Sequence, residues 1–414
     1  MLVDGLLITA PPFDRVAPGP AGVRRYGPGR SHCGYTLFSP GMGNIVCLVD
    51  DAGIMVHWWA VERTHLAQLL PGGNLLVDTY GEHGGLRELN PEGGCVWQWE
   101  GPYHHDFDLR PDGRIVLLTS RKEPAMRDFF ASNETPQTIF NDIIIEMDRQ
   151  GRVLWQFSLA AHVSEMIEVA GLPEPVRYAI KTPDNSLVVV RQPDWAHTNT
   201  VEVLPQTPLG LRDPRFRAGN ILFSCRALDL IGVIDRQQEK VVWAWGPGTL
   251  DGQHQPTMLP DGHLLMFDNG TYRGYSVVRE IAPESGVQVW EYSAPGAFFS
   301  PYRSGVQRLG NGNTLICESD AGRIFEVTPQ REIVWDYYSP FWGTNTANEG
   351  RHVYRATRYT EEEVSSLFCQ KPGPSAVGND RRITVKSFGE ALEHYESGFL
   401  GKSWTVEECS DISL

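Results

Sequence analysis

The chain has 414 residues, of which 41% are hydrophobic and 21% are charged, and it contains 12 tryptophans. This composition is typical of a globular protein with a large core and excludes a disordered or fibrous chain. With 36 basic and 51 acidic residues the formal net charge is −15. We expect no nucleic-acid partner, because neutralising phosphates requires a basic face.

The cellular location is predicted from the N-terminus and the cysteines. Residues 1–8 carry an acid inside a very short apolar run and have no basic region before it, which is not typical of a signal peptide. No stretch of about 18 apolar residues occurs, so no membrane partner is expected. The seven cysteines are dispersed and never form a C-x-x-C pair. We therefore expect reduced thiols in a cytoplasmic protein.

Six segments of the chain share one rhythm of short apolar strands and Gly-containing turns, and their last strands carry tryptophan. An incomplete copy opens the series, and the six segments are 34–59, 69–97, 109–155, 219–243, 259–290 and 309–335. Four strands per unit in radial repetition are the signature of a β-propeller. The sequence therefore predicts an all-β, six-bladed β-propeller over residues 34–359, after an N-terminal segment of residues 1–33.

Insertions interrupt the middle copies at 121–142, 158–196 and 205–218. Loops of this length in a compact fold are usually lids or ordered excursions. The pattern of residues 159–170, inside the second insertion, indicates a short helix.

The two ends of the propeller are predicted to meet. The first copy lacks its innermost strand, whereas residues 351–358 after the sixth copy form a strand without a partner. We expect this strand to close the first blade, because that pairing removes two exposed sheet edges. The segment 360–414 is predicted to be a helical and irregular tail, opened by a capping box at 360–363.

The innermost strands of a propeller line its channel, so polar residues that recur there are candidate site residues. His65, His105 and His254 each lie six residues before the first turn of their copy, and Ser304 has the same place before Gly310. His197 lies eight residues before Pro205, and a shift of two keeps a side chain on the same strand face. A single histidine at a strand end is typically structural, but four in register indicate a site.

Two arginines complete this set of candidates. Arg226 and Arg121 each end a second strand, where a guanidinium fork suits a planar or tetrahedral oxyanion. An ion pair between blades is the alternative for both, and it is favoured for Arg121. Walker, Rossmann and G-x-S-x-G motifs are absent in a strand-to-helix context.

Five short motifs resemble the bacterial arylsulfate sulfotransferases, and the likeness covers roughly residues 34–359. They are HHD at 104–106, DWAHTN at 194–199, SCR at 224–226, QH at 253–254 and FDNG at 267–270. That family is a six-bladed propeller that moves a sulfuryl group between phenols by a ping-pong route through a sulfated histidine.

The resemblance implies a role for each matching residue. His254 would be the nucleophile, and His105, His197 and Arg226 would bind the sulfuryl oxygens and serve in proton transfer. Asn199 and Asn269 are expected to contact the substrate, as are His65, Arg121 and Ser304. No metal or organic cofactor would be needed, and the expected partner is a small anionic or aromatic molecule. The well-known members of the family are periplasmic, with a signal peptide, an added β-domain and a disulfide that this sequence does not indicate.

Two other readings use the same residues. His105, His197 and His254 are alternative ligands for one divalent metal ion in a lyase, hydrolase or oxygenase, since converging imidazoles suit zinc, copper or iron. The third reading is a non-enzymatic propeller that serves as an interaction platform.

Overall fold

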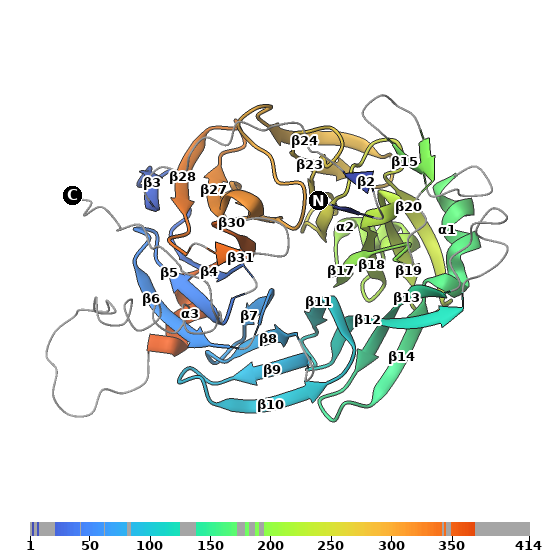
Figure 1. Cartoon of the computed structure of the whole chain (residues 1–414), viewed down its shortest axis with the longest axis horizontal. Helices are drawn as coiled ribbons and strands as arrows, with labels where there is room; N and C mark the ends of the chain where they lie inside the picture. The colour runs from blue at the N-terminus through green and yellow to red at the C-terminus, as the bar shows by residue number, and fades with distance from the viewer. Residues whose placement is uncertain are drawn as a thin grey trace, which may run out of the picture. The chain divides into compact units, whose positions relative to one another are not determined.

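The structure is a computed structural model, drawn in Figure 1. The residues that it describes are 2–3, 6–7, 21–41, 43–61, 63–80, 84–124, 138–171, 179–181, 187–189, 194–341, 343–344 and 349–368. Their regular secondary structure is almost entirely β-strand, and they divide into two compact units.

Unit 1 comprises residues 1–13 and 102–302 and holds three four-stranded blades. The first is β11 (Tyr103–Leu109), β12 (Ile115–Pro124), β13 (Thr138–Met147) and β14 (Val153–Ser158). The second is β17 (Thr198–Val203), β18 (Ile221–Cys225), β19 (Leu230–Asp235) and β20 (Lys240–Trp245). The third is β21 (His254–Met258), β22 (Leu264–Asp268), β23 (Val277–Ala282) and β24 (Val287–Ser293).

Short elements complete unit 1. They are the hairpins β1 (Leu2–Val3) with β2 (Leu6–Leu7) and β15 (Ala179–Lys181) with β16 (Leu187–Val189), the helices α1 (Val163–Ala170) and α2 (Pro208–Arg212), and the 3-10 turns η1 (Ala160–His162), η2 (Pro214–Phe216) and η3 (Arg226–Leu228). The helix expected at 159–170 is confirmed by η1 and α1.

Unit 2 comprises residues 14–101 and 303–414 and holds the other three blades. One is β31 (Val353–Tyr359), β4 (Tyr35–Pro40), β5 (Ile45–Val49) and β6 (Met55–Ala60). The next is β7 (Ala67–Leu69), β8 (Leu75–Thr79), β9 (Gly85–Leu89) and β10 (Cys95–Glu100). The last is β25 (Gly305–Arg308), β26 (Thr314–Glu318), β27 (Arg323–Val327), β28 (Ile333–Tyr338) and β3 (Gly22–Tyr26). The remaining elements are η4 (Ser319–Ala321), β29 (Gly343–Thr344), β30 (Glu349–Gly350) and α3 (Glu361–Phe368).

Six antiparallel blade sheets confirm the expected fold class, a six-bladed β-propeller. The closing strand is confirmed as well. β31 pairs with β4 in the register Val353 opposite Pro40 and Tyr359 opposite Tyr35, so the first blade receives its innermost strand from the segment that follows the sixth repeat. The capping box that opens α3 is also present, because Thr360 N–H donates to Glu363 Oε2 at 2.7 Å.

One pairing was not expected from the sequence. β3, in the segment before the first repeat, adds a fifth strand to the outer edge of β28, with Tyr26 opposite Trp335 and Gly22 opposite Tyr338. The outer edge of this blade is therefore paired, which is one way in which sheet proteins avoid an open edge.

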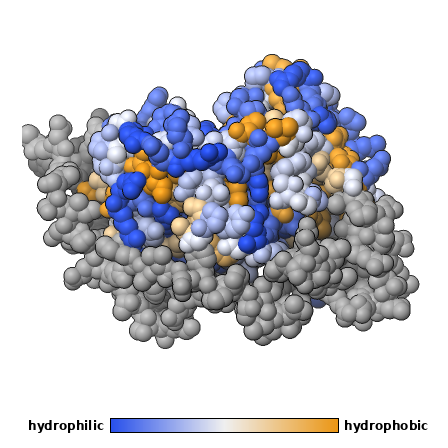
Figure 2. All heavy atoms as spheres, turned by 90° about the horizontal axis from the view of Figure 1, so that it is seen from above, coloured by the Kyte–Doolittle hydropathy of each residue, from blue (hydrophilic) through white to orange (hydrophobic). Residues whose placement is uncertain are grey.

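Burial follows position within each blade. The second strands β8, β18, β22 and β26 are buried along their whole length, because both of their faces are covered. The outermost strands β10, β14 and β24 expose Val96, Val153 and Val287, each more than half accessible. On the face seen in Figure 2, hydrophilic residues cover much of the described surface with smaller hydrophobic areas between them. No helix in the described ranges has the length and apolar character to traverse a bilayer.

Candidate active site

The innermost strands of unit 1 begin in an unusual backbone conformation. His105 (φ 60°), His197 (φ 45°) and Gln255 (φ 47°) lie in the left-handed region that side chains with a β-carbon rarely adopt. The pairing of β11, β17 and β21 with their second strands also shifts register near these residues. A bulge and a left-handed residue together redirect the local side chains, and such strain is typical of functional sites.

Three histidine rings gather at the starts of β11 and β17. The Nε2 atoms of His105 and His197 are 3.1 Å apart, and their ring centroids are 4.6 Å apart. The ring of His104 lies 4.1 Å from that of His105. We call His104, His105 and His197 the histidine cluster. The register of the repeats predicted His105 and His197, whereas His104 was recognised only as part of the HHD motif.

Asp194 fixes the protonation of His197. Its Oδ2 lies 2.5 Å from Nδ1 of His197. Burial raises the pKa of Asp194, but the hydrogen bond from His197 and the positive charges of His197, His104 and Arg226 together outweigh burial, and the net pKa is lowered. An ionised Asp194 requires the proton on Nδ1 of His197. The 3.1 Å contact between Nε2 of His197 and Nε2 of His105 then holds one shared proton.

His104 has a carboxylate partner of its own. Its Nδ1 lies 3.7 Å from Oδ1 of Asp142, while Oδ2 of Asp142 accepts the backbone N–H of Thr198 at 2.7 Å. Burial raises the pKa of Asp142 and lowers the pKa of His104, and their mutual attraction opposes both shifts. The sequence had not marked Asp142. It lies on β13 without a recognisable motif, and only the fold brings it to the histidine cluster.

His254 begins β21 and is 95% buried, with a relative exposure of 5%. Its Nδ1 lies 2.8 Å from Oδ1 of Asn269 and 3.0 Å from the carbonyl oxygen of Gly252. The amide nitrogen of Asn269 donates to the carbonyl of Ser300 at 2.8 Å, which orients Oδ1 towards His254. Because two acceptors face Nδ1, this atom carries the proton in the neutral ring, and the lone pair is on Nε2.

Arg226 connects the two groups. It begins η3, and its backbone N–H donates to the carbonyl of His197 at 3.2 Å. Its guanidinium carbon lies 5.0 Å from the centre of the Tyr302 ring. A β-carbon on Gly252, next to the loop of His254, would lie 3.8 Å from Nε of Arg226. The structure therefore brings Arg226 to the backbone of both His197 and the His254 loop.

The two asparagines are buried and hold backbone groups. Asn199 Nδ2 donates to the carbonyl of Gln253 at 2.8 Å, and so joins β17 to the residue before His254. Asn269 orients His254, as described above. Both side chains have a relative exposure of 0%. The contacts that the structure gives them are positioning contacts.

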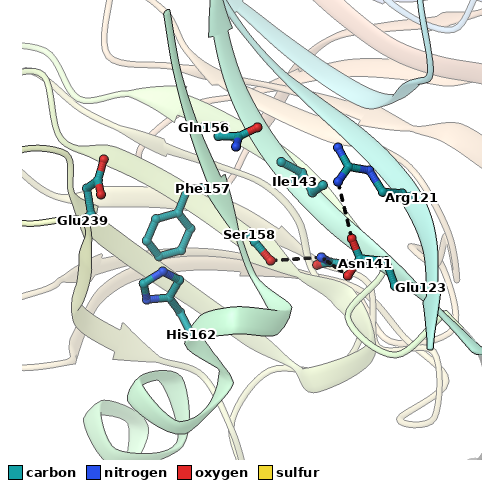
Figure 3. Close-up of a pocket in the computed structure, with 9 residues that line it drawn as sticks. All are labelled: Arg121, Glu123, Asn141, Ile143, Gln156, Phe157, Ser158, His162 and Glu239. Carbon is teal, nitrogen blue, oxygen red and sulfur yellow. Dashed lines mark hydrogen bonds and ion pairs between the residues drawn. The ribbon is translucent and has the colours of Figure 1, made fainter. Parts of the chain in front are cut away.

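Arg121 is not brought to the histidine cluster by any described contact. Its side chain is 67% exposed and lies 3.7 Å from Glu123 on the same strand. It lines a cavity of about 220 Å³ together with Asn141, Gln156, His162 and others, and none of the histidine cluster contributes to that cavity (Figure 3). The sequence favoured an ion pair between blades for Arg121, whereas the ion pair that the structure gives it is with Glu123 within β12.

His65 and Ser304 belong to unit 2. The ring of His65 stacks on Tyr354 with centroids 4.5 Å apart, and burial lowers its pKa to about 3. Ser304 has a left-handed backbone (φ 77°), and its Oγ accepts the N–H of Ser319 at 3.1 Å. Ser304 directly precedes β25, and His65 lies two residues before β7, so both stand at the start of an inner strand, as the repeat register predicted.

Potential metal ligands gather elsewhere. Asp261, His263 and Glu280 form the one group of three or more such side chains, among the described residues, whose ligand atoms all lie within 4.8 Å of one another. His263 Nδ1 lies 2.8 Å from Oε1 of Glu280. His105, His197 and His254, the alternative ligand set, do not form such a group.

Comparison with known proteins decides the family. The sequence profile of the arylsulfotransferase (ASST) family matches residues 66–339, a span that contains the histidine cluster, Arg226 and His254. The chain belongs to the arylsulfotransferase family. The family supports a transferase with aryl sulfotransferase-like function, in agreement with the resemblance of the short motifs. No curated protein matches the chain.

Two solved structures match most of this chain at low sequence identity. A protein of unknown function from Bacteroides caccae is 12% identical over 79% of this chain and 99% of that chain, with a TM-score of 0.48. A streptogramin B lyase is 14% identical over 81% of this chain and 87% of that chain, with a TM-score of 0.43.

Proposed function

We propose that this member of the arylsulfotransferase family carries a sulfuryl group from an aryl sulfate donor to a phenolic acceptor by way of a sulfohistidine at His254. The observation that carries the proposal is the fixed tautomer of His254. The carbonyl of Gly252 and Oδ1 of Asn269 both face Nδ1, so the nucleophilic lone pair is on Nε2. A neutral imidazole of this kind is a competent nucleophile at neutral pH.

In the first half-reaction, Nε2 of His254 attacks the sulfur of the aryl sulfate. The N–S bond forms as the bond between sulfur and the phenolic oxygen breaks, and the phenolate leaves. In the second half-reaction, the oxygen of the acceptor phenol attacks the same sulfur, the N–S bond breaks, and His254 regains its lone pair. Sulfur, charge and protons balance if one proton moves to the leaving phenolate and one leaves the acceptor phenol.

The histidine cluster supplies that proton balance. When both Nδ1 atoms are protonated, the further proton between Nε2 of His105 and Nε2 of His197 gives the pair a net charge of +1. This proton goes to the leaving phenolate, which leaves two neutral imidazoles, and the pair takes a proton back from the acceptor. The carboxylate of Asp194 stabilises the cation on His197 while the pair is fully protonated. Arg226 supplies a permanent positive charge for the sulfuryl oxygens, and such preorganised charge lowers the barrier of group transfer.

The test is to trap the covalent intermediate. The protein is incubated with phenyl sulfate without an acceptor, quenched, and digested for peptide mass analysis under neutral or mildly basic conditions. We expect the mass of one sulfuryl group on the peptide that contains His254, and its loss on addition of a phenol.

Two variants accompany the trapping experiment. His254→Ala removes the nucleophile and is expected to abolish both the adduct and the transfer. His263→Ala serves as the matched control, because His263 bonds to Glu280 outside the site, and this variant is expected to form the adduct normally. Transfer without an adduct on His254, or an adduct that persists in His254→Ala, would refute the proposed mechanism.

A further inference from the structure

The turn that carries Arg226 also carries an aspartate with no role in the chemistry described so far. Asp229 follows η3, has a left-handed backbone (φ 50°), and donates its N–H to the carbonyl of Arg226 at 3.2 Å. Oδ1 of Asp229 accepts the backbone N–H of Gly252 at 2.7 Å. The side chain of Asp229 therefore reaches from the Arg226 turn to the loop that precedes His254.

Gly252 is held on both sides. Its N–H bonds to Asp229, and its carbonyl oxygen lies 3.0 Å from Nδ1 of His254. Its backbone is left-handed (φ 72°), and a β-carbon there would lie 2.8 Å from Oγ1 of Thr271. Glycine is required at this position, and the direction of its carbonyl depends on the bond that fixes its N–H.

We propose that Asp229 is a positioning residue, which acts through Gly252 to hold the Nδ1 proton of His254 and through η3 to set Arg226 at a fixed place beside the His254 loop. Without the bond from Asp229, Gly252 is free to rotate its carbonyl away from Nδ1, and one of the two described acceptors that hold the Nδ1 proton is lost, while Oδ1 of Asn269 keeps the other bond. This role rests on the proposed nucleophilic function of His254.

The charge of Asp229 makes this positioning depend on pH. Burial, with a smaller contribution from the carboxylates of Asp251 and Asp268, raises the pKa of Asp229 to about 7, although the N–H of Gly252 and the guanidinium of Arg226 oppose the shift. Asp251 is itself bonded to the backbone N–H groups of Tyr272 and Arg273.

Other charged groups face the same region. Asp268 bonds to the guanidinium groups of Arg273 and Arg279, and the phenol of Tyr272 lies within electrostatic reach of Asp229 and Arg226. An ionised Asp229 accepts the Gly252 N–H more strongly than a protonated one. The rate of sulfohistidine formation is therefore expected to rise with pH through the neutral range.

The test uses Asp229→Asn and Asp229→Ala in the full chain, with Asp261→Asn as the matched control. Asp261 caps a turn of the β21–β22 hairpin through its bond to the His263 N–H. The first readout is the ¹⁵N NMR spectrum of the histidine rings, which reports the tautomer of His254 directly. We expect Asp229→Ala to raise the population of the Nε2-protonated tautomer of His254 above its wild-type level, because one of two Nδ1 acceptors is lost. Asp261→Asn is expected to leave the wild-type spectrum.

The second readout is the pH profile of the single-turnover release of phenol from phenyl sulfate. Asp229→Asn keeps an oxygen acceptor but cannot ionise, so its profile is expected to be flat from about pH 6 to 8, where the wild type rises. Asp229→Ala is expected to be slower by about tenfold, the size of one lost hydrogen bond to a charged group. If Asp229→Ala does not fold, the pH profile of phenol release by Asp229→Asn still tests the positioning role of Asp229.

The outcomes separate this inference from the proposed function. Wild-type tautomer spectra together with wild-type pH profiles in both Asp229 variants would overturn the positioning role while sulfohistidine formation stands. Absence of any adduct on His254 would refute the proposed function, and the tautomer spectra would then still show whether Asp229 controls the ring of His254.

Discussion

Replacing Asp194 by asparagine tests the proton relay at one atom. Oδ2 of Asp194 lies 2.5 Å from Nδ1 of His197, and asparagine keeps a neutral oxygen acceptor at the same place. The variant therefore removes the negative charge and leaves the shape of the site. Because Asp194 is partly exposed, with 30% of its side chain accessible, the fold is expected to tolerate the change.

The size of the effect follows from the hydrogen bond. A hydrogen bond to a charged group contributes about 1.5–3 kcal/mol, and a neutral one contributes about 0.5–1.5 kcal/mol. The difference, about 1–2 kcal/mol, is the expected increase in the activation free energy of the step in which the imidazolium of His197 forms or donates its proton. This energy corresponds to about a 5- to 30-fold slower step. The loss appears only when the leaving phenolate needs that proton in the transition state.

The assay is single-turnover phenol release from a series of substituted phenyl sulfates. Nitrophenyl sulfate has a stable leaving phenolate and is expected to react at nearly the wild-type rate in Asp194→Asn. Unsubstituted phenyl sulfate is expected to show the full loss, so the dependence of rate on leaving-group basicity becomes steeper. Asp112→Asn, at a surface turn where Asp112 pairs with Arg114, serves as the control. An equal loss across the whole series would refute the relay through Asp194.

Two further predictions concern stability. Burial raises the pKa of Glu202 to about 8, although the N–H of Met258 opposes the shift. The folded state therefore favours the protonated form of Glu202 more than the unfolded state does. As a result, the free energy of unfolding falls as the pH rises from the ordinary carboxyl pKa to about 8. Glu202→Gln should flatten that slope in urea titrations, and an unchanged slope would contradict this account. The hydroxyl of Tyr359 accepts the N–H of Leu69 at 3.0 Å, so Tyr359→Phe should lower the free energy of unfolding by about 1–3 kcal/mol, the cost of an unsatisfied buried N–H. A urea midpoint equal to the wild type would contradict that prediction.

The blades were predictable because their signal is periodic. Each copy repeats strands, turns and a tryptophan at similar spacing, so six imperfect copies reinforce one another. The closing strand followed from the same count, since one copy lacked an inner strand and one strand after the last copy lacked a partner. β3 carried no such signal. Its residues 22–26 match no repeat position, and its pairing with β28 depends on backbone groups at a sheet edge.

The site was predictable in part for the same reason. The repeat register placed His105, His197 and His254 at equivalent strand starts, and the structure has them there. The repeat register could not show that His105 contacts His197, or that Asn269 holds His254. These contacts depend on left-handed residues and bulges, which the repeat pattern does not indicate. Asp142 comes to the cluster from a strand with no motif. Such partners follow from tertiary packing and leave no mark in the local pattern.

The inner strands of unit 1 also explain how the strained histidines are held in place. An innermost strand has one edge with N–H groups that its own blade does not bond. Oδ2 of Asp106 and Oδ2 of Asp108, on β11, accept the N–H groups of Val201 and Val203 on β17 at 3.2 and 2.7 Å. Glu202, on β17, accepts an N–H from β21 in the same way at 2.9 Å.

These carboxylates join the three inner strands β11, β17 and β21 by hydrogen bonds that lie next to the bulges carrying His105 and His197. A left-handed residue costs about 1–3 kcal/mol and persists only where its surroundings fix it from several sides. The links hold β17 to both of its neighbours and hold β11 to β17, and so supply part of that constraint. The same buried carboxylates that satisfy the strand edges therefore allow the histidines to keep a conformation that an isolated strand would relax.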